Sequence, residues 1–387
     1  MAGAARAPAV VYGAAILQGF AFTLMPALAT VFAQAPYRIS GASFGGLFVP
    51  LTLGAIVAAI VTPALARRYG MVRVLGLGVL ANVVALLALL ASPLVAGTGA
   101  YLLLLADTAA LGMGFGLNFS AVNELAAGLR GPSARNVTLA NVLTGLGTAL
   151  TPLLVGALVA RGLWPLWPAL LALAFAGVFL LSLGWHSEMP AKHPRALPPV
   201  TLALVLFALA ALLYAVCEGV FSSWATTFTH VDRGFSLASG EAALAAFWLA
   251  LTVTRLLAAF TTGTLSPRTA LVLFPLAIAA AFVALPLWSS APELIAGFAL
   301  GGVACSIVFP YAMSLAFDAV PADENRVAGV LVGALMAGEG MGTFAVGVLH
   351  GSAGFTLAQV YRVAGGIAVV LALVAFVAVR AGSGKVS

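Results

Sequence analysis

The sequence predicts an all-α integral membrane protein with twelve transmembrane helices, and three observations support this prediction. Of the 387 residues, 63% are hydrophobic and only 7% are charged, whereas soluble domains carry about 25% charged residues. The mean hydropathy is +1.14. The apolar runs lack the strict alternation of barrel strands, and only helices or closed barrels pair every backbone group inside a bilayer.

The apolar runs are long enough to cross a membrane, because about 20 helical residues span the hydrocarbon core. The first run follows Arg6 and is too long for a cleavable signal, so we read it as a retained span. Prolines inside the runs are compatible with helices, since neighbouring membrane helices satisfy the freed backbone groups. These prolines are Pro26, Pro50, Pro152, Pro275 and Pro310. The expected spans are 9–32, 44–66, 73–92, 99–125, 137–160, 163–185, 199–228, 240–264, 269–289, 293–317, 327–349 and 358–380.

Lysines and arginines in the loops predict the orientation, because cytoplasmic loops are enriched in them. With the N-terminus inside, the inside segments hold Arg6, Arg67, Arg68, Arg73, Arg130, Arg135, Lys192, Arg195, Arg268, Arg326, Arg380 and Lys385. The outside segments hold only Arg38, Arg161, Arg233 and Arg362. We therefore expect a multi-pass protein of the cell inner membrane with both termini in the cytoplasm. The net charge of +6 follows from this topology, so no nucleic-acid partner is expected.

A polar stretch near the midpoint, 185–199, divides the chain into two similar halves. We predict an N-terminal six-helix bundle over 1–186, a cytoplasmic linker over 187–198 and a C-terminal six-helix bundle over 199–387. Similar short stretches recur at an offset of 200 residues, as Gln18-Gly19-Phe20 and Glu218-Gly219-Val220 show. The pattern indicates a six-plus-six repeat.

The loop after the second span resembles a motif of the major facilitator superfamily, Gly-x-Leu-x-Asp-Arg-x-Gly-Arg-Arg. Pro63 replaces the first glycine, and Arg67 stands where the family has an acidic residue that helps to latch the inward face. The resemblance implies twelve helices in two six-helix pseudo-repeats, with a substrate site near the midplane between the halves. The matching positions are Leu65, Arg68, Gly70 and Arg73.

Two later stretches resemble the fucose:proton symporter-like branch of that superfamily. They are 214–224, which holds a Tyr…Glu…Trp pattern, and 247–257, which holds Trp…Thr…Arg-Leu-Leu. A third stretch, 141–156, is similar to the family's glycine-and-proline helix 5. Sugar symporters of this branch also use acidic residues in helices 1 and 4. Helix 1 here has no carboxylate, and Phe115 lies in the middle of the corresponding part of helix 4.

Ionisable residues inside the predicted spans are candidates for function, because a charge near the bilayer centre costs a few kcal/mol, on the order of 3. We predict Glu218 and Glu339 as proton-coupling residues and Arg255 as their ion-pair partner. The alternatives are carboxylates that only join neighbouring helices, and an arginine that contacts the substrate directly. Gating roles are expected for Asp107, Glu124, Arg68 and Arg73, with a polar helix end or a local salt bridge as the alternative.

Neutral polar and aromatic residues in the spans are candidates for substrate binding. Amides both donate and accept hydrogen bonds, and an indole face suits the apolar face of a sugar. The alternatives are interhelical hydrogen bonds and aromatic anchoring at the membrane interface. The candidates are Gln18, Asn118, Asn123, Asn141, Tyr214, Trp224, Trp248 and Tyr311.

Several other patterns predict no chemistry. Gly112-x-Gly114-x-Gly116 lies inside an apolar run, so helix packing explains it. The four histidines have no metal-ligand spacing, and Cys217 and Cys305 lie in apolar runs as packing residues. We therefore expect no cofactor, no metal and no enzymatic activity.

These observations predict a secondary active transporter that works by alternating access. The main prediction is proton-coupled uptake of a sugar or another small polar metabolite. The alternative is a proton-driven exporter of drugs or amphiphiles, and more distant alternatives are a channel or receptor and a membrane enzyme. The expected partners are the substrate, protons and the lipid bilayer, and we expect a monomer.

Overall fold

The structure is a computed structural model that describes residues 2–39, 41–185, 200–260, 266–320 and 324–383. The chain divides into two compact units, Met1–Pro194 and Arg195–Ser387, and each is described by itself below. The predicted linker over 187–198 lies outside the described residues. Every regular element in the described part of the chain is helical, as the apolar runs without alternation predicted.

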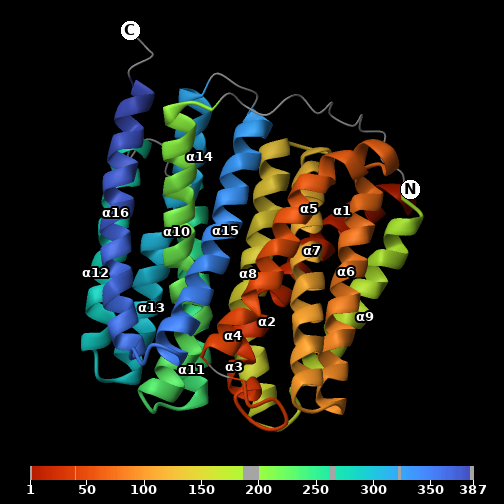
Figure 1. Cartoon of the computed structure of the whole chain (residues 1–387). Helices are drawn as coiled ribbons and strands as arrows, with labels where there is room; N and C mark the ends of the chain where they lie inside the picture. The colour runs from red at the N-terminus through yellow and green to blue at the C-terminus, as the bar shows by residue number, and fades with distance from the viewer. Residues whose placement is uncertain (1, 40, 186–199, 261–265, 321–323, 384–387) are drawn as a thin grey trace. The chain divides into compact units, whose positions relative to one another are not determined.

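In unit 1 the long helices run side by side along the unit (Figure 1). Short helices α2, α3 and α4 follow α1 at one end of the unit, at the bottom of the view. The elements are α1 (Ala2–Phe22), α2 (Leu24–Ala27), α3 (Ala29–Phe32), α4 (Ala42–Gly46), α5 (Phe48–Tyr69), α6 (Met71–Ala91), η1 (Ser92–Leu94), α7 (Thr98–Ala127), α8 (Ser133–Val159) and α9 (Leu166–Leu183).

Unit 2 is built in the same way, and α15 lies along α10 (Figure 1). The last six residues of the α10 span, Thr227–Asp232, form a π-helix, a local widening that often marks functional sites. The elements are α10 (Leu202–Thr226), η2 (Thr227–Asp232), α11 (Leu237–Phe260), α12 (Pro267–Ala284), η3 (Leu285–Leu287), α13 (Ala291–Cys305), α14 (Val308–Ala319), α15 (Glu324–Gly351) and α16 (Leu357–Ser383).

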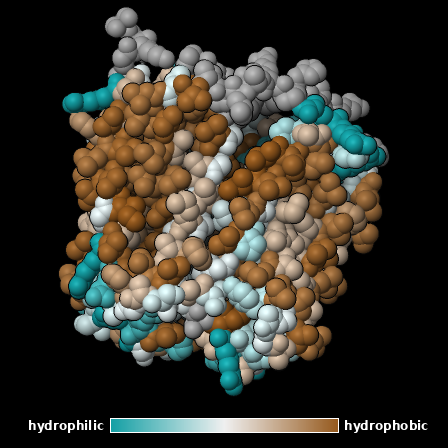
Figure 2. Space-filling model, viewed as in Figure 1, coloured by the Kyte–Doolittle hydropathy of each residue, from teal (hydrophilic) through white to brown (hydrophobic). Residues whose placement is uncertain are grey.

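The described residues contain twelve segments that are long and apolar enough to cross a membrane. This confirms the predicted number of spans. Large apolar side chains on the outside of the helices are exposed, such as Ile60 at 72% and Leu173 at 71%. Figure 2 shows hydrophobic side chains over the middle of the helices and hydrophilic ones mainly near the helix ends. Such a surface is suited to contact with the hydrocarbon core of a lipid bilayer.

Three of the confirmed spans contain a break in the helix. The helix is interrupted near Thr23, Leu47 and Ser306. Each break lies three or four residues before a proline, at Pro26, Pro50 and Pro310 respectively. Proline lacks the N–H that would bond the carbonyl four residues earlier, and its ring clashes with that carbonyl. Pro152 and Pro275, in contrast, lie inside continuous helices.

Glycines produce matching helix crossings in the two units. In unit 1 a Cβ on Gly19 would collide with the carbonyl of Thr144, so α1 and α8 touch through their backbones. In unit 2 a Cβ on Gly219 would lie 2.7 Å from the carbonyl oxygen of Glu339, where α10 meets α15. Gly219 follows Gly19 by the predicted offset of 200 residues. Glycines allow such close approach of membrane helices.

Hydroxyl groups make further contacts one turn along each crossing, at Thr23 between α1 and α2 in unit 1 and at Ser223 on α10 in unit 2. Thr23 donates a hydrogen bond of 2.9 Å to the carbonyl of Thr148 in unit 1. The hydroxyls of Ser223 and Thr343 lie 2.9 Å apart in unit 2. The internal repeat is therefore visible in the contacts of each unit as well as in the sequence.

Candidate functional site

A buried carboxylate, a phenol and a guanidinium form a connected group in unit 2. Tyr214 and Glu218 lie one turn apart on α10, and the Tyr214 hydroxyl donates a 2.8 Å hydrogen bond to Glu218 Oε1. Arg255 on α11 donates to the Tyr214 hydroxyl over 3.1 Å. Its Nη2 is 3.8 Å from Glu218 Oε1. Tyr214 therefore bridges a positive and a negative charge.

Arg255 is also held by the break between α13 and α14. Its Nε donates a 2.7 Å hydrogen bond to the carbonyl of Ser306. In a continuous helix this carbonyl would accept from residue 310, but Pro310 has no N–H to donate. The proline that interrupts the helix thus leaves an acceptor available for the guanidinium.

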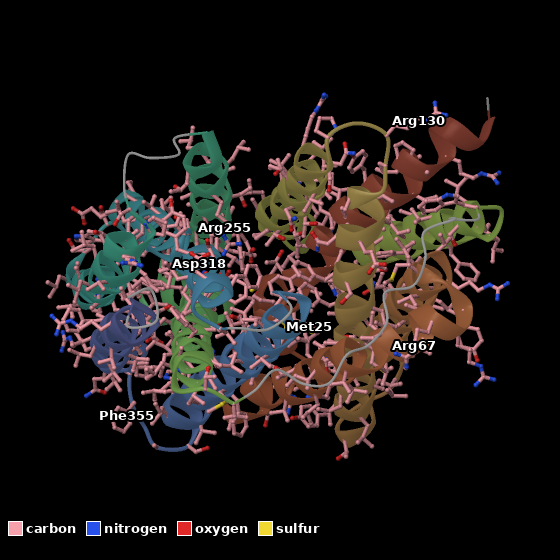
Figure 3. All side chains as sticks on the ribbon, turned by 90° about the horizontal axis from the view of Figure 1, so that it is seen from above. Met25, Arg67, Arg130, Arg255, Asp318 and Phe355 are labelled. Carbon is pink, nitrogen blue, oxygen red and sulfur yellow. The ribbon has the colours of Figure 1, made fainter. Side chains whose placement is uncertain are left out.

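The two charges of this group differ in exposure. The side chain of Arg255 is 38% exposed and that of Glu218 is 10% exposed. Figure 3 labels Arg255 within unit 2. A partly exposed guanidinium in the middle of a span is costly against lipid, and such groups face polar partners or water-filled spaces. The group can therefore exchange a proton or meet a polar ligand.

Glu339 on α15 lies against α10 but is not joined to Arg255. Its Oε1 accepts a 3.2 Å hydrogen bond from the Ser222 hydroxyl, one turn beyond Glu218. Among the described residues, Arg255 forms an ion pair with Glu218, and the His350 ring lies 4.0 Å from Asp232, a contact that is ionic only when His350 is protonated; neither contact involves Glu339. The structure thus places both predicted carboxylates at the α10–α15 crossing, and their proton-coupling role stays a prediction.

Three amides form a buried group in unit 1. Gln18 Oε1 on α1 accepts hydrogen bonds from Asn82 Nδ2 on α6, at 2.8 Å, and from Asn118 Nδ2 on α7, at 2.9 Å. All three side chains are at most 3% exposed. Gln18 Nε2, Asn82 Oδ1 and Asn118 Oδ1 have no hydrogen-bond partner among the described residues. The amides therefore join three helices and retain unused donors and acceptors.

Gln18→Leu is expected to destabilise the protein, because it leaves two buried amide donors without their shared acceptor. Each unsatisfied buried donor costs about 1–3 kcal/mol, and Asn82 keeps a second bond to the carbonyl of Gly78 at 3.1 Å. We expect a loss of about 2 kcal/mol in reversible unfolding in mixed micelles. Asn123→Leu is the control, because the Asn123 side chain takes part in a hydrogen bond that is exposed to solvent and its loss should cost less. Equal losses in both variants would contradict the buried role of Gln18.

Asn123 on α7 and Asn141 on α8 form a separate amide pair. Asn141 Nδ2 donates to Asn123 Oδ1 over 2.9 Å in an exposed position. Asn141 is exposed and Asn123 is half-buried. Of the predicted amides in unit 1, this pair is therefore the more accessible to a ligand, whereas Gln18 and Asn118 are enclosed by their own unit.

The predicted aromatic residues differ in exposure in the same way. Tyr214 and Trp224 are buried, at 0% and 1% exposure, and the Trp224 indole donates a 3.2 Å hydrogen bond to the carbonyl of Thr343. Trp248 is 7% exposed. Tyr311 is half-buried on α14. Tyr214 and Trp224 thus have interhelical partners in this conformation, and substrate binding by the aromatic residues stays a prediction.

The predicted gating residues do not form a common group. Asp107 on α7 is 1% exposed, and its Oδ2 has no hydrogen-bond partner in the described part of the chain. Glu124 is half-buried, and none of the ion pairs between described residues joins it to Arg130 or Arg135. Arg68 and Arg73 are exposed at the loop between α5 and α6. Their gating roles stay predictions.

Several buried or paired polar residues were not among the predicted candidates. Asn82 completes the amide group, and it interrupts an otherwise apolar stretch of α6, which was the available signal. Glu241 on α11 is 1% exposed, and neither carboxylate oxygen has a hydrogen-bond partner among the described residues. It lies one residue after the predicted start of the span, at 240, and was not singled out from the sequence. Asp232 and His350 pair across 118 residues of sequence, which no local pattern reveals.

Comparisons with known proteins identify the fold. The sequence matches the profile of the family described as Major Facilitator Superfamily over residues 10–291. Comparison with curated protein sequences found no significant match. Solved structures with the same fold include a mutant of the nucleoside transporter NupG, at 14% identity and TM-score 0.71, covering 95% of this chain and 99% of that one.

Two further structures are sugar transporters by their descriptions. A D-xylose-proton symporter has 16% identity and TM-score 0.72, covering 98% of this chain and 99% of that one. The inward-open xylose transporter XylE from E. coli has 12% identity and TM-score 0.73, covering 95% of both chains. At these identities the likeness concerns the fold.

Proposed function

The chain belongs to the major facilitator superfamily, and on that premise we propose that it takes up a sugar or a similar small polar metabolite together with protons. A secondary transporter of this fold works by alternating access. The observation that supports proton coupling is the Glu218–Tyr214–Arg255 group inside the membrane-spanning part of unit 2. The D-xylose-proton symporter among the structural neighbours supports coupled movement of substrate and proton in the same direction.

Glu218 has the chemistry that a coupling residue needs. As a carboxylate it balances Arg255, whose guanidinium stays charged because it cannot realistically lose its proton. When Glu218 takes up a proton, that balance is lost, and Arg255 requires water or another partner. Proton binding therefore changes the interactions between α10 and α11, and such a differential interaction is what shifts a conformational equilibrium.

The polar groups of unit 1 fit a hydroxyl-rich substrate. The exposed Asn123–Asn141 pair offers both donors and acceptors, and each substrate hydroxyl also does both. Unit 1 contributes neutral amides, whereas the ionisable group lies in unit 2. We propose that substrate recognition depends on the amides of α7 and α8 and that proton coupling depends on Glu218.

The cellular setting is part of the proposal. The loop arginines and lysines support an inner-membrane protein with both termini in the cytoplasm. One chain carries both six-helix units, which supports a monomer embedded in lipid.

The substrate class can be tested by ligand-dependent stabilisation of the purified protein in detergent. A ligand at about 100 times its Kd adds about 2.7 kcal/mol to folded-state stability. Pentoses, hexoses, nucleosides, organic acids and amphiphilic drugs would be compared, and each stabilising compound would then be used in counterflow into proteoliposomes. Stabilisation and counterflow with a sugar or nucleoside support the proposal. Stabilisation by amphiphilic drugs alone would refute it in favour of an exporter.

A further inference from the structure

Two loops in unit 2 share a sequence motif, His-x-x-x-Gly-Phe-Ser/Thr-Leu. The first, 230–237, joins the π-helix η2 to α11, and the second, 350–357, joins α15 to α16. The glycines take the same positive backbone angle, with φ of 73° at both Gly234 and Gly354. The same backbone hydrogen bonds close the loops: Arg233 N to Phe228 O, Phe235 N to Thr229 O, Ala353 N to Val348 O and Phe355 N to Leu349 O.

The histidine of each loop contacts the carbonyl of the loop's phenylalanine. His230 Nδ1 is 2.6 Å from the carbonyl oxygen of Phe235, and His350 Nδ1 is 2.9 Å from that of Phe355. A carbonyl oxygen only accepts, so Nδ1 must carry the proton in both rings. In a neutral ring Nε2 is then an acceptor with no hydrogen.

The two loops differ in what Nε2 meets. His350 Nε2 is 4.0 Å from Asp232 Oδ1, a residue of the first loop. The other oxygen, Asp232 Oδ2, accepts a 3.2 Å hydrogen bond from the backbone N–H of Leu357. The Asp232 carboxylate therefore contacts both the first residue of the second loop, His350, and the last, Leu357. The two side chains are 28% and 20% exposed, so solvent screens their interaction only in part.

We propose that Asp232 and His350 form a proton-binding site that joins the two loops when His350 is protonated. Neutral His350 presents a lone pair to a carboxylate oxygen, and two acceptors form no bond. A proton from solvent that binds Nε2 converts the ring to imidazolium, which donates to Asp232 and is attracted by its charge. This step ties the end of the α10 span to the α15–α16 loop.

Other charged and aromatic side chains lie near this site. Arg233 donates to the carbonyls of Pro286 and Trp288. Trp224 presents its ring edge-on, with its centroid 6.3 Å from that of His350. Tyr361 on α16 packs on Phe228, at 4.8 Å between ring centroids, and its phenol also interacts electrostatically with Asp232. Arg362 is exposed and is in no ion pair between described residues. Asp232 is thus the charged partner that the structure gives His350.

Thermal unfolding of the purified protein between about pH 5 and about pH 8, where histidine titrates, tests this site. The stabilisation requires protonated His350, so it is present at low pH and is lost as the pH rises. We expect wild type to unfold about 2 °C above Asp232→Asn at about pH 5, and both to unfold together at about pH 8. His350→Gln should resemble Asp232→Asn.

His230→Gln is the matched control, because it removes the same bond to a phenylalanine carbonyl and leaves Asp232 and His350 in place. It should keep the pH-dependent difference that wild type shows against Asp232→Asn. A pH profile in His350→Gln identical to that of wild type would overturn the proposal. Equal loss of the pH dependence in His230→Gln and His350→Gln would also overturn it, because loop closure alone would then explain the effect.

The protonation of His350 can also be measured in the wild-type protein, so the test does not depend on the variants folding. In protein labelled with nitrogen-15 histidine, His350 Nδ1 should be protonated throughout, and Nε2 should change from bare nitrogen at about pH 8 to N–H at about pH 5. The opposite tautomer, or an Nε2 that stays bare at about pH 5, would contradict the proposed site. Neither experiment depends on transport, so the result is independent of the proposed function.

Discussion

Glu218→Gln is expected to abolish proton-driven accumulation of substrate while sparing substrate exchange. The amide keeps the size of the side chain and can still accept from Tyr214, but it cannot bind and release a proton. For each coupled proton, a gradient of about one pH unit supplies about 1.4 kcal/mol, or about tenfold accumulation. In proteoliposomes with such a gradient the variant should reach an accumulation ratio of about 1, whereas counterflow should continue.

Glu241→Gln is the control for this result, because it makes the same chemical change at another buried glutamate of unit 2. Glu241 is 1% exposed and is in no ion pair with a described residue, so coupling should survive its replacement. Full accumulation by Glu218→Gln would exclude Glu218 as the coupling residue. Loss of counterflow as well as accumulation would assign Glu218 to substrate binding or folding.

Gly342→Ala is expected to destabilise unit 2 strongly. A Cβ at this position would lie 2.9 Å from the Cα of Val216 and close to its carbonyl oxygen. Both contacts are backbone atoms of α10, so no side chain can move aside and the helices must separate. Overpacking of this kind costs about 1–3 kcal/mol. Glu218 and Glu339 lie at the same crossing, so we also expect weaker transport. Unfolding would be measured reversibly in mixed micelles, and transport would be measured in proteoliposomes.

Gly333→Ala on the same helix is the matched control. A Cβ at Gly333 meets nothing within 4 Å, and replacing a helical glycine by alanine stabilises a helix by roughly 0.5–1 kcal/mol. This variant should therefore be as stable as wild type or more so. Equal destabilisation by both alanines would contradict this account, because the contact with α10 would then not determine the effect.

Much of the fold could be predicted from composition and loop charge, because the bilayer restricts the possible structures. About 20 apolar residues must form a helix there, and the twelve spans follow from that rule. Which prolines interrupt their helix, as happens near Thr23, Leu47 and Ser306, could not be predicted. Pro26 and Pro310 interrupt their helices whereas Pro152 does not, and this difference depends on tertiary packing that one sequence does not contain.

The candidate site was predictable where a charge stands alone in an apolar run. Glu218, Glu339 and Arg255 were found in this way, since each is costly in a membrane without a partner. The bridging position of Tyr214 was not predicted, because it depends on how α11 crosses α10. The pairing of Asp232 with His350 was missed for a similar reason, since it requires two loops far apart in sequence to meet.

Proton-coupled symport is tested most directly by the pH change that accompanies substrate entry. Proteoliposomes in weakly buffered medium would receive an identified substrate outside while the external pH is recorded. Symport predicts that the external medium becomes more alkaline, whichever way the protein is inserted, and that a protonophore or Glu218→Gln removes the change. Acidification during substrate entry, or entry without any pH change, would contradict proton-coupled symport.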